Sequence, residues 1–137
     1  ISAISLGIAS ACLSYVIRYT SERTQFNTPI AHFQIVQERI AEMATQLDAG
    51  RALVYAAAKA YDRGDRDMTL GAKSKLFAAR MATMAGLDAI QIFGGYGYMK
   101  EYPVERYLRD AKLMEIGAGT NEVMRLIIAK RLLSTHD

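Results

Sequence analysis

Residues 33 to 62 constrain the possible fold more strongly than any other part of this sequence. Apolar or small residues recur there at steps of four and three, at Val36, Ile40, Met43, Leu47, Gly50, Val54, Ala57 and Tyr61. Because an α-helix turns once every 3.6 residues, this spacing places all of these side chains on one face. The pattern predicts a long helix with one buried face, which needs other helices to cover it.

A second run with the same spacing occupies residues 68 to 93, at Leu76, Ala79, Thr83, Gly86, Ile90 and Phe93. The segment between the two runs, Arg63 to Asp67, is charged and contains a glycine, which is typical of a turn. We therefore expect two long helices that pair antiparallel.

The two ends of the chain, about residues 1 to 22 and 120 to 134, carry apolar residues on more than one face, which predicts helices that are covered on several sides. Proline occurs only at positions 29 and 103, and no segment alternates for long enough to predict a strand. The sequence predicts an all-α, up-and-down four-helix bundle with a short additional helix near 103 to 112. Surplus apolar faces imply contacts with further domains or subunits.

Charge and cysteine content exclude several classes of protein. The net charge of +3 is spread along 137 residues, which disfavours binding to nucleic acid or to an anionic membrane. Residues 1 to 17 are uncharged, but serines interrupt them and no basic segment precedes them, so a buried helix is favoured over a signal peptide or membrane span. The start without Met suggests a chain that begins inside a longer protein.

No metal site is predicted. The lone Cys12 can form neither a disulfide framework nor a cysteine metal site, and it fits a reducing compartment. His32 has no partner at metal-ligand spacing and is interpreted as a loop or capping residue. A four-helix metal carboxylate protein is disfavoured because the sequence contains no Glu-x-x-His pair.

Three segments rich in glycine, proline or polar residues interrupt the helical pattern: RTQFNTPIAHFQ (23 to 34), QIFGGYGYMKEYPVERYLRDAK (91 to 112) and EIGAGTNEV (115 to 123). Individually, each has two interpretations. The glycines could form a tight turn or approach a phosphate, Arg23 could pair with a phosphate or a helix C-terminus, and Thr120 could bind a ligand or cap the last helix beside Glu122. The glycines do not form a dinucleotide fingerprint, because no strand precedes them.

In this order and spacing, the three segments closely resemble the C-terminal helical domain of the acyl-CoA dehydrogenase family, over essentially all 137 residues. Members of that family are flavoenzymes with an N-terminal helical domain, a middle β domain and a C-terminal four-helix bundle, usually assembled as tetramers. The resemblance implies that residues 1 to 137 are the C-terminal domain and that the other two domains are absent from this chain.

The resemblance also implies an FAD site shared between neighbouring subunits. Arg23 matches the arginine that contacts the flavin pyrophosphate, and Phe26 and Gln34 match neighbours of the adenosine half. Three residues of the second segment match contacts with the diphosphate and ribose region: Gln91, Gly94 and Gly95. Thr120 and Glu122 match positions that touch the cofactor of the same subunit, although many relatives have Gln at the second position.

The resemblance places no catalytic base in this chain. In many family members the third segment reads Tyr-Glu-Gly-Thr, and its glutamate removes the α-proton of the acyl-CoA. The matching residues here are Gly117, Ala118, Gly119 and Thr120, and alanine cannot accept a proton.

One interpretation follows the isovaleryl-CoA dehydrogenase subgroup, in which the base lies on the preceding helix, here upstream of Ile1. Gly117, Ala118 and Gly119 would then make room for a branched acyl group. The other is a tight turn in a member without dehydrogenase activity.

The resemblance implies that the intact protein removes α and β hydrogens from an acyl-CoA and passes electrons from FAD to an electron-transferring flavoprotein. The domain alone would be inactive, and it would contribute FAD binding and assembly into a homo-oligomer, dimer or tetramer. The alternative is a non-catalytic helical oligomerisation module. Bacterial or archaeal cytoplasm and the mitochondrial matrix are both compatible with these features.

Overall fold

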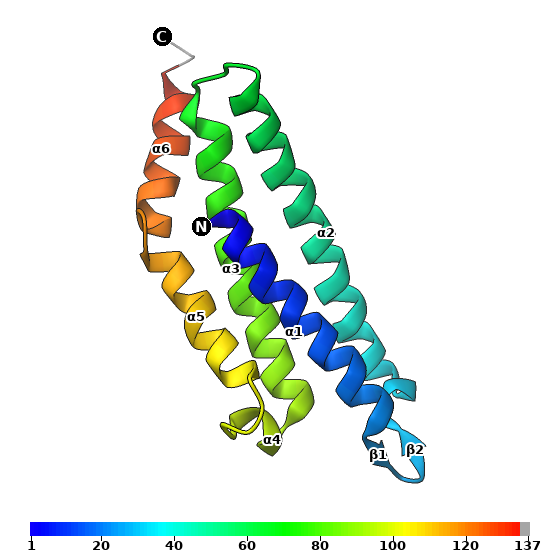
Figure 1. The fold of residues 1–137 in the computed structure, drawn as a ribbon. Helices are drawn as coiled ribbons and strands as arrows, with labels where there is room; N and C mark the ends of the chain where they lie inside the picture. Colours follow the sequence, from blue (N-terminus) through cyan, green and yellow to red (C-terminus); the bar gives the residue numbers. More distant parts are fainter. Residues whose placement is uncertain (135–137) are drawn as a thin grey trace.

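The apolar runs of the sequence form long helices in the computed structural model, which describes residues 1–134 (Figure 1). The helices are α1 (Ser2–Glu22), α2 (Gln34–Asp62), α3 (Met68–Phe93), α4 (Gly95–Tyr98), α5 (Val104–Ile116) and α6 (Asn121–Leu133). Between α1 and α2 lie a small antiparallel hairpin, β1 (Thr24–Gln25) and β2 (Thr28–Pro29), and a 3-10 turn, η1 (Ile30–His32). The all-α prediction is confirmed, with this hairpin as an addition that the sequence pattern did not predict.

The helices α1, α2 and α3 alternate in direction along the chain (Figure 1). The helix α5 runs opposite to α3, and α6 continues in the direction of α5 after a break at residues 117 to 120. The additional helix predicted near 103 to 112 is present as α5. That helix extends to Ile116 and has 13 residues, as many as α6.

The centre of the bundle is α3, which packs against α1, α2, α5 and α6. Small side chains allow these close approaches, since the buried residues of α3 include Ala72, Ala78, Ala79, Ala82, Ala85 and Ala89. The predicted face of α2 is buried along its middle, at Met43, Leu47 and Gly50. The main apolar cluster joins these residues to Cys12 and Val16 of α1, both fully buried. Burial raises the pKa of the Cys12 thiol to about 12, so it stays neutral.

The last helix is less covered than its sequence predicts. Among the described residues of α6, only Asn121 is buried, and Leu126 and Leu133 are exposed. We expected this helix to be buried on several sides, but residues 1–134 do not bury it in this way.

Two helices, α1 and α3, are long and apolar enough to cross a membrane by length and composition alone. Both contribute to the core: α3 is its central helix, and α1 buries Leu6, Ala9, Cys12 and Val16. Packing within the bundle accounts for their apolar character.

The turn predicted at residues 63 to 67 is present between α2 and α3. Asp67 caps α3, because its Oδ1 accepts a hydrogen bond from the Thr69 amide at 2.8 Å. Its Oδ2 also accepts from Arg131 Nε at 3.2 Å, which ties the end of α6 to the start of α3.

Candidate functional site

A tight hairpin after α1 turns the chain and exposes an aromatic ring. The two central residues of the turn, Phe26 and Asn27, have φ angles of 52° and 60°, as a two-residue hairpin of the primed type requires. A bulky residue is uncommon in this left-handed region. The Phe26 side chain is 89% exposed, and its ring lies edge-on to Phe33 with the centroids 6.3 Å apart.

The α3–α4 junction lies at the same end of the bundle as the hairpin (Figure 1). Gly94 ends α3 with φ 59° and ψ −134°, a conformation open to glycine and strained for other residues. The next helix, α4, folds back closely on α3: a Cβ added to Gly97 would lie 2.7 Å from the Ile90 carbonyl oxygen. The Tyr19 ring stacks on Phe93 at 4.0 Å between centroids, so α1 is joined to this junction.

These two turns form one pocket of about 610 Å³, which we call the Arg23 pocket. Its walls are Tyr19, Arg23, Gln25, Ile30, Ile92, Phe93, Gly94, Gly95, Tyr96 and Met99. Arg23 reaches over the Tyr96 ring, with 5.5 Å between its guanidinium carbon and the ring centroid. The structure thus brings together three of the predicted cofactor residues, Arg23, Gly94 and Gly95. A guanidinium beside two glycines, where backbone can come close to a ligand, suits an anionic phosphate group.

Three other predicted cofactor residues, Phe26, Gln34 and Gln91, are exposed and do not line the Arg23 pocket. Gln34 is the first residue of α2, and Gln91 lies in the last turn of α3. The sequence analysis missed Tyr19 and Tyr96 as pocket residues. Tyr96 could have been found, because it lies within the glycine motif that carried the resemblance.

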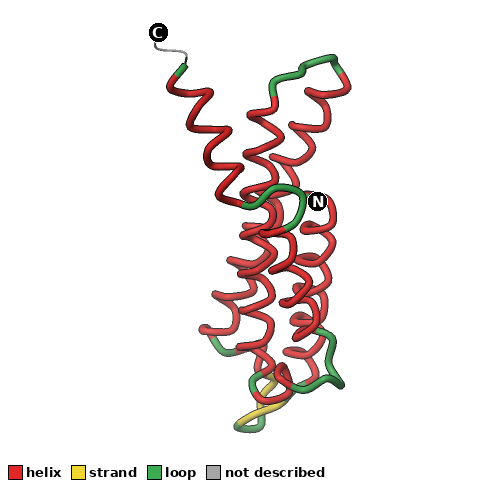
Figure 2. Tube along the Cα trace, turned by 90° about the vertical axis from the view of Figure 1, so that its left-hand side faces the viewer, coloured by secondary structure: helices red, strands yellow, loops and turns green. Residues whose placement is uncertain are grey.

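Thr120 and Glu122 are not part of the Arg23 pocket. Thr120 is the last residue of the segment Gly117–Thr120, and Glu122 is in the first turn of α6. This segment lies about midway along the bundle in both Figure 1 and Figure 2, whereas the hairpin and α4, beside the Arg23 pocket, lie at one end. Ala118 and Gly119 have φ angles of 52° and 88°, so two successive left-handed residues separate α5 from α6. Thr120 caps α6: its Oγ1 accepts from the Val123 amide at 3.4 Å.

Both acidic residues beside Gly117–Thr120 already have protein partners. Burial acts to raise the pKa of Glu115, but hydrogen bonds from Thr83 and Lys112 outweigh it and lower the pKa. Hydrogen bonds from its own backbone amide and from Thr120 lower the pKa of Glu122, and this carboxylate also pairs with Arg125 at 2.9 Å. Both carboxylates are therefore already engaged by groups of the protein.

The start of the chain lies level with this segment along α3. Ser2 Oγ is 3.4 Å from Ser74 Oγ, and the adjacent Lys75 donates to Asn121, the first residue of α6, at 3.1 Å. The beginnings of α1 and α6 therefore both contact the same turn of α3.

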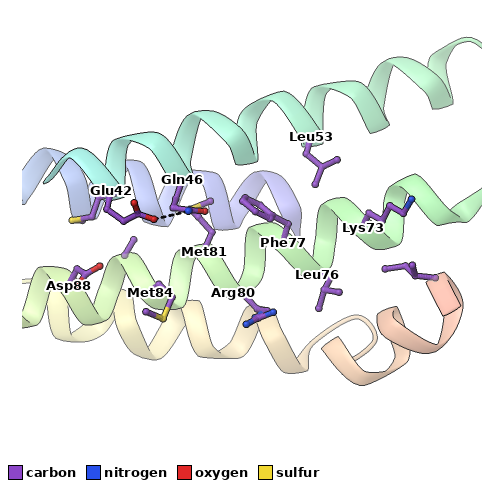
Figure 3. A pocket seen from close by; sticks show the side chains of 13 residues that line it. Glu42, Gln46, Leu53, Lys73, Leu76, Phe77, Arg80, Met81, Met84 and Asp88 are labelled. Atoms are coloured by element: carbon purple, nitrogen blue, oxygen red, sulfur yellow. Dashed lines mark hydrogen bonds between the residues drawn. The ribbon is translucent and has the colours of Figure 1, made fainter. Parts of the chain in front are cut away.

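A second pocket, of about 630 Å³, lies along α2 and α3 and reaches Ile128 of α6 (Figure 3). We call it the α2–α3 groove. Its apolar lining includes Leu53, Leu76, Phe77, Met81 and Met84. At one end Gln46 donates to Glu42 at 2.8 Å. None of the predicted site residues lines the groove, and residues 1–134 hold no cluster of His, Cys, Asp and Glu that could bind a metal ion.

The fold and the Arg23 pocket define a helical domain suited to holding a phosphate-containing cofactor. Comparison with known proteins agrees: residues 1–133 match the family described as "Acyl-CoA dehydrogenase, C-terminal domain", and the chain belongs to this family. Its members are FAD-dependent flavoprotein oxidoreductases, so FAD is the cofactor of the class.

The relatives include proteins named for different substrates. The chain is 51% identical to an acyl-CoA dehydrogenase of Bacillus subtilis and 46% identical to cyclohexane-1-carbonyl-CoA dehydrogenase of Geobacter metallireducens. It is 47% identical to mitochondrial isovaleryl-CoA dehydrogenase of Oryza sativa. The first two matches cover 97% of this chain and the third 93%, but they cover only 35%, 35% and 31% of the relatives. These matches therefore establish the family. They do not distinguish the isovaleryl-CoA dehydrogenase subgroup, because relatives with other names have similar sequence identity to this chain.

Solved structures of the family superpose closely. Butyryl-CoA dehydrogenase of Megasphaera elsdenii matches with a TM-score of 0.95 at 42% identity, over 96% of this chain and 34% of that one. A chain from a structure described as the electron transferring flavoprotein of Acidaminococcus fermentans matches with a TM-score of 0.94 at 45% identity, over 96% of this chain and 35% of that one.

Proposed function

We propose that this chain is the FAD-binding and oligomerising C-terminal part of an acyl-CoA dehydrogenase that introduces an α,β double bond into an acyl-CoA thioester. The family match and the Arg23 pocket support this proposal. Since the chain spans about 35% of the length of its relatives, catalysis belongs to the longer protein, whose other parts would be an N-terminal helical domain and a middle β domain. Bound FAD would supply the hydride acceptor.

The separation of the two predicted cofactor clusters supports a flavin shared between subunits. The hairpin end of α1 and the α3–α4 junction, which hold Arg23, Gly94 and Gly95, lie at one end of the bundle. The start of α6, which holds Thr120 and Glu122, lies about midway along it. In our proposal Thr120 and Glu122 contact the FAD of their own subunit, and the Arg23 pocket holds the pyrophosphate of a neighbouring subunit's FAD. Phe26, Gln34 and Gln91, exposed around that end, complete the contact with its adenosine half.

We assign the catalytic base to a glutamate upstream of Ile1, on the helix that continues into α1. The contact between Ser2 and Ser74 supports this assignment, because it places the start of α1 beside the turn of α3 that also holds the start of α6. A carboxylate arriving there could reach the segment formed by Gly117, Ala118 and Gly119. These small residues would accommodate a branched or bulky acyl group.

A second candidate function is a non-catalytic oligomerisation module that keeps the family fold. It is favoured by Ala118 at the usual base position and by the engagement of Glu115 and Glu122 with protein partners. This candidate predicts a stable oligomer that forms without flavin.

The test is an anaerobic titration of the full-length flavoprotein with isovaleryl-CoA, isobutyryl-CoA and straight-chain acyl-CoAs. Bleaching of the visible flavin absorbance by one class would establish dehydrogenation and identify the preferred acyl group. Transfer of those electrons to an electron-transferring flavoprotein would then identify the partner. Bound flavin that no acyl-CoA bleaches would favour the non-catalytic module.

A further inference from the structure

A buried lysine beneath the Gly117–Thr120 segment has no role in the function proposed above. The Lys75 side chain belongs to central helix α3, and the residue is only 6% exposed. Its Nζ donates to the Glu115 carbonyl oxygen at 3.3 Å and to Asn121 Oδ1 at 3.1 Å. The first acceptor is in the last turn of α5 and the second is the first residue of α6, so one ammonium group joins the two helices across the break.

The remaining polar atoms of this cluster complete a connected network. Asn121 Nδ2 donates to Glu115 Oε2 at 3.4 Å, and Thr83 Oγ1 donates to Glu115 Oε1 at 2.6 Å. Among the described residues, no buried side-chain nitrogen or oxygen lacks a hydrogen-bond partner. Both ends of residues 116 to 120 are thus held by polar contacts to α3.

Joining two helices through a buried ammonium group carries a desolvation cost. Burial lowers the pKa of Lys75, although the negative charges of Glu115 and Glu122 act against this shift. Replacing a whole buried polar pair with apolar side chains of similar volume avoids this desolvation cost and often stabilises proteins. Stability alone therefore does not explain the choice of lysine, whereas its directional hydrogen bonds specify the relative position of the helix ends.

The segment between the anchors needs such support because its backbone is strained. Ala118 has φ 52°, a left-handed conformation in which the Cβ lies too close to the following carbonyl oxygen. Because Glu115 and Asn121 are both hydrogen-bonded to Lys75, the ends of α5 and α6 are held and cannot shift to relieve this strain.

We propose that Lys75 is a positioning residue: it holds Gly117–Thr120 in the one conformation that keeps the acyl site open. This inference rests on the proposed function, because it takes the segment to border the acyl group of the substrate. Lys75 acts through the backbone of α5 and the side chain of Asn121, and it has no contact with the reacting atoms in this proposal.

The experiment compares Lys75→Met with Lys59→Met in the full-length flavoprotein. Lys59 is exposed in the last turn of α2, so the control removes an equal charge outside both the network and the α2–α3 groove. Hydrogen exchange at residues 116 to 120 should become about tenfold faster in Lys75→Met, as expected from the loss of charge-assisted hydrogen bonds. It should stay unchanged in Lys59→Met. This readout does not require activity, so it remains valid if the proposed function is wrong.

Kinetics then separate positioning from a general loss of stability. Lys75→Met leaves Asn121 Oδ1 without its donor, and adding Asn121→Leu replaces both partners with apolar groups, which should restore the melting temperature. We expect the double variant to keep fast local exchange and a KM for acyl-CoA raised about tenfold, with kcat changed less. Recovery of KM and local exchange together with the melting temperature would overturn the proposal. Uniformly faster exchange over α3, α5 and α6 in Lys75→Met would also overturn it.

Discussion

Single residues at helix ends carry most of the specific chemistry of this domain. Arg23 is the residue at which α1 gives way to the hairpin, and its carbonyl accepts from the Ile30 amide at 2.8 Å. This hydrogen bond fixes the backbone that positions the guanidinium. Ala118 is the opposite case: its side chain can do no acid–base chemistry, and its φ of 52° contributes the left-handed turn between α5 and α6.

Arg23→Ala should weaken FAD binding in the full-length protein. Loss of one charge-assisted contact to a phosphate corresponds to about 1.5–3 kcal/mol, which is a rise of about 10- to 100-fold in the Kd for FAD. The measurement is flavin retained after dialysis, followed by titration of the apoprotein. Arg18→Ala is the matched control, because Arg18 lies over the Tyr15 ring and outside the Arg23 pocket. Equal flavin retention in both variants would count against the assignment.

Among the elements, α3 and α4 decide the shape of the Arg23 pocket. The alanines of α3 let four helices approach it, and the close contact of Gly97 with Ile90 sets how α4 folds back at its end. Because Gly94 joins these two helices and Gly95 is the first residue of α4, the position of α4 determines the position of the predicted phosphate contacts.

Gly97→Ala should destabilise the protein and impair the pocket. The added Cβ would lie 2.7 Å from the Ile90 carbonyl oxygen and 2.8 Å from Ile90 Cα, so α4 must move away from α3. We expect a loss of about 1–3 kcal/mol in the free energy of unfolding, measured with denaturant, together with weaker FAD binding. Gly71→Ala is the control: it lies within α3, a Cβ there meets nothing within 4 Å, and it should gain about 0.5–1 kcal/mol. Equal effects of the two substitutions would contradict this account of α4.

At the scale of the whole molecule, the bundle leaves apolar surface uncovered. Leu126 and Leu133 are exposed on α6, and the α2–α3 groove is lined mainly by apolar side chains. Large exposed apolar areas mark interaction sites in most proteins. We therefore expect the groove to contact a second copy in the homo-oligomer that we propose.

Met84→Glu should dissociate the full-length oligomer into smaller species. Met84 lines the α2–α3 groove and is 57% exposed, so a carboxylate there would be buried without a partner if another subunit covers it. Sedimentation at several protein concentrations measures the change. Met68→Glu serves as the control, because Met68 is exposed on the same helix but outside the groove. An unchanged oligomer in Met84→Glu would exclude the groove as a subunit contact.

By itself, the sequence determined the long helices and the family. The helical period is local, so the spacing of apolar residues predicted α1, α2 and α3 and the turn at residues 63 to 67 nearly to the residue. The three interrupting segments were sufficient to place the chain in its family. The extension of α5 to Ile116 was missed, because a glycine-rich segment follows it and the helix buries only Val104, Ala111 and Met114.

Only the tertiary structure decided which of these residues meet. It brought Arg23, Gly94 and Gly95 into one pocket and kept Thr120 and Glu122 apart from them, because these positions depend on how the helices pack and not on spacing along the chain. Lys75 shows the same limit. In the sequence it resembles any solvated lysine of a helix, and it is buried only because α5 and α6 meet over that turn of α3 and bring its two acceptors there.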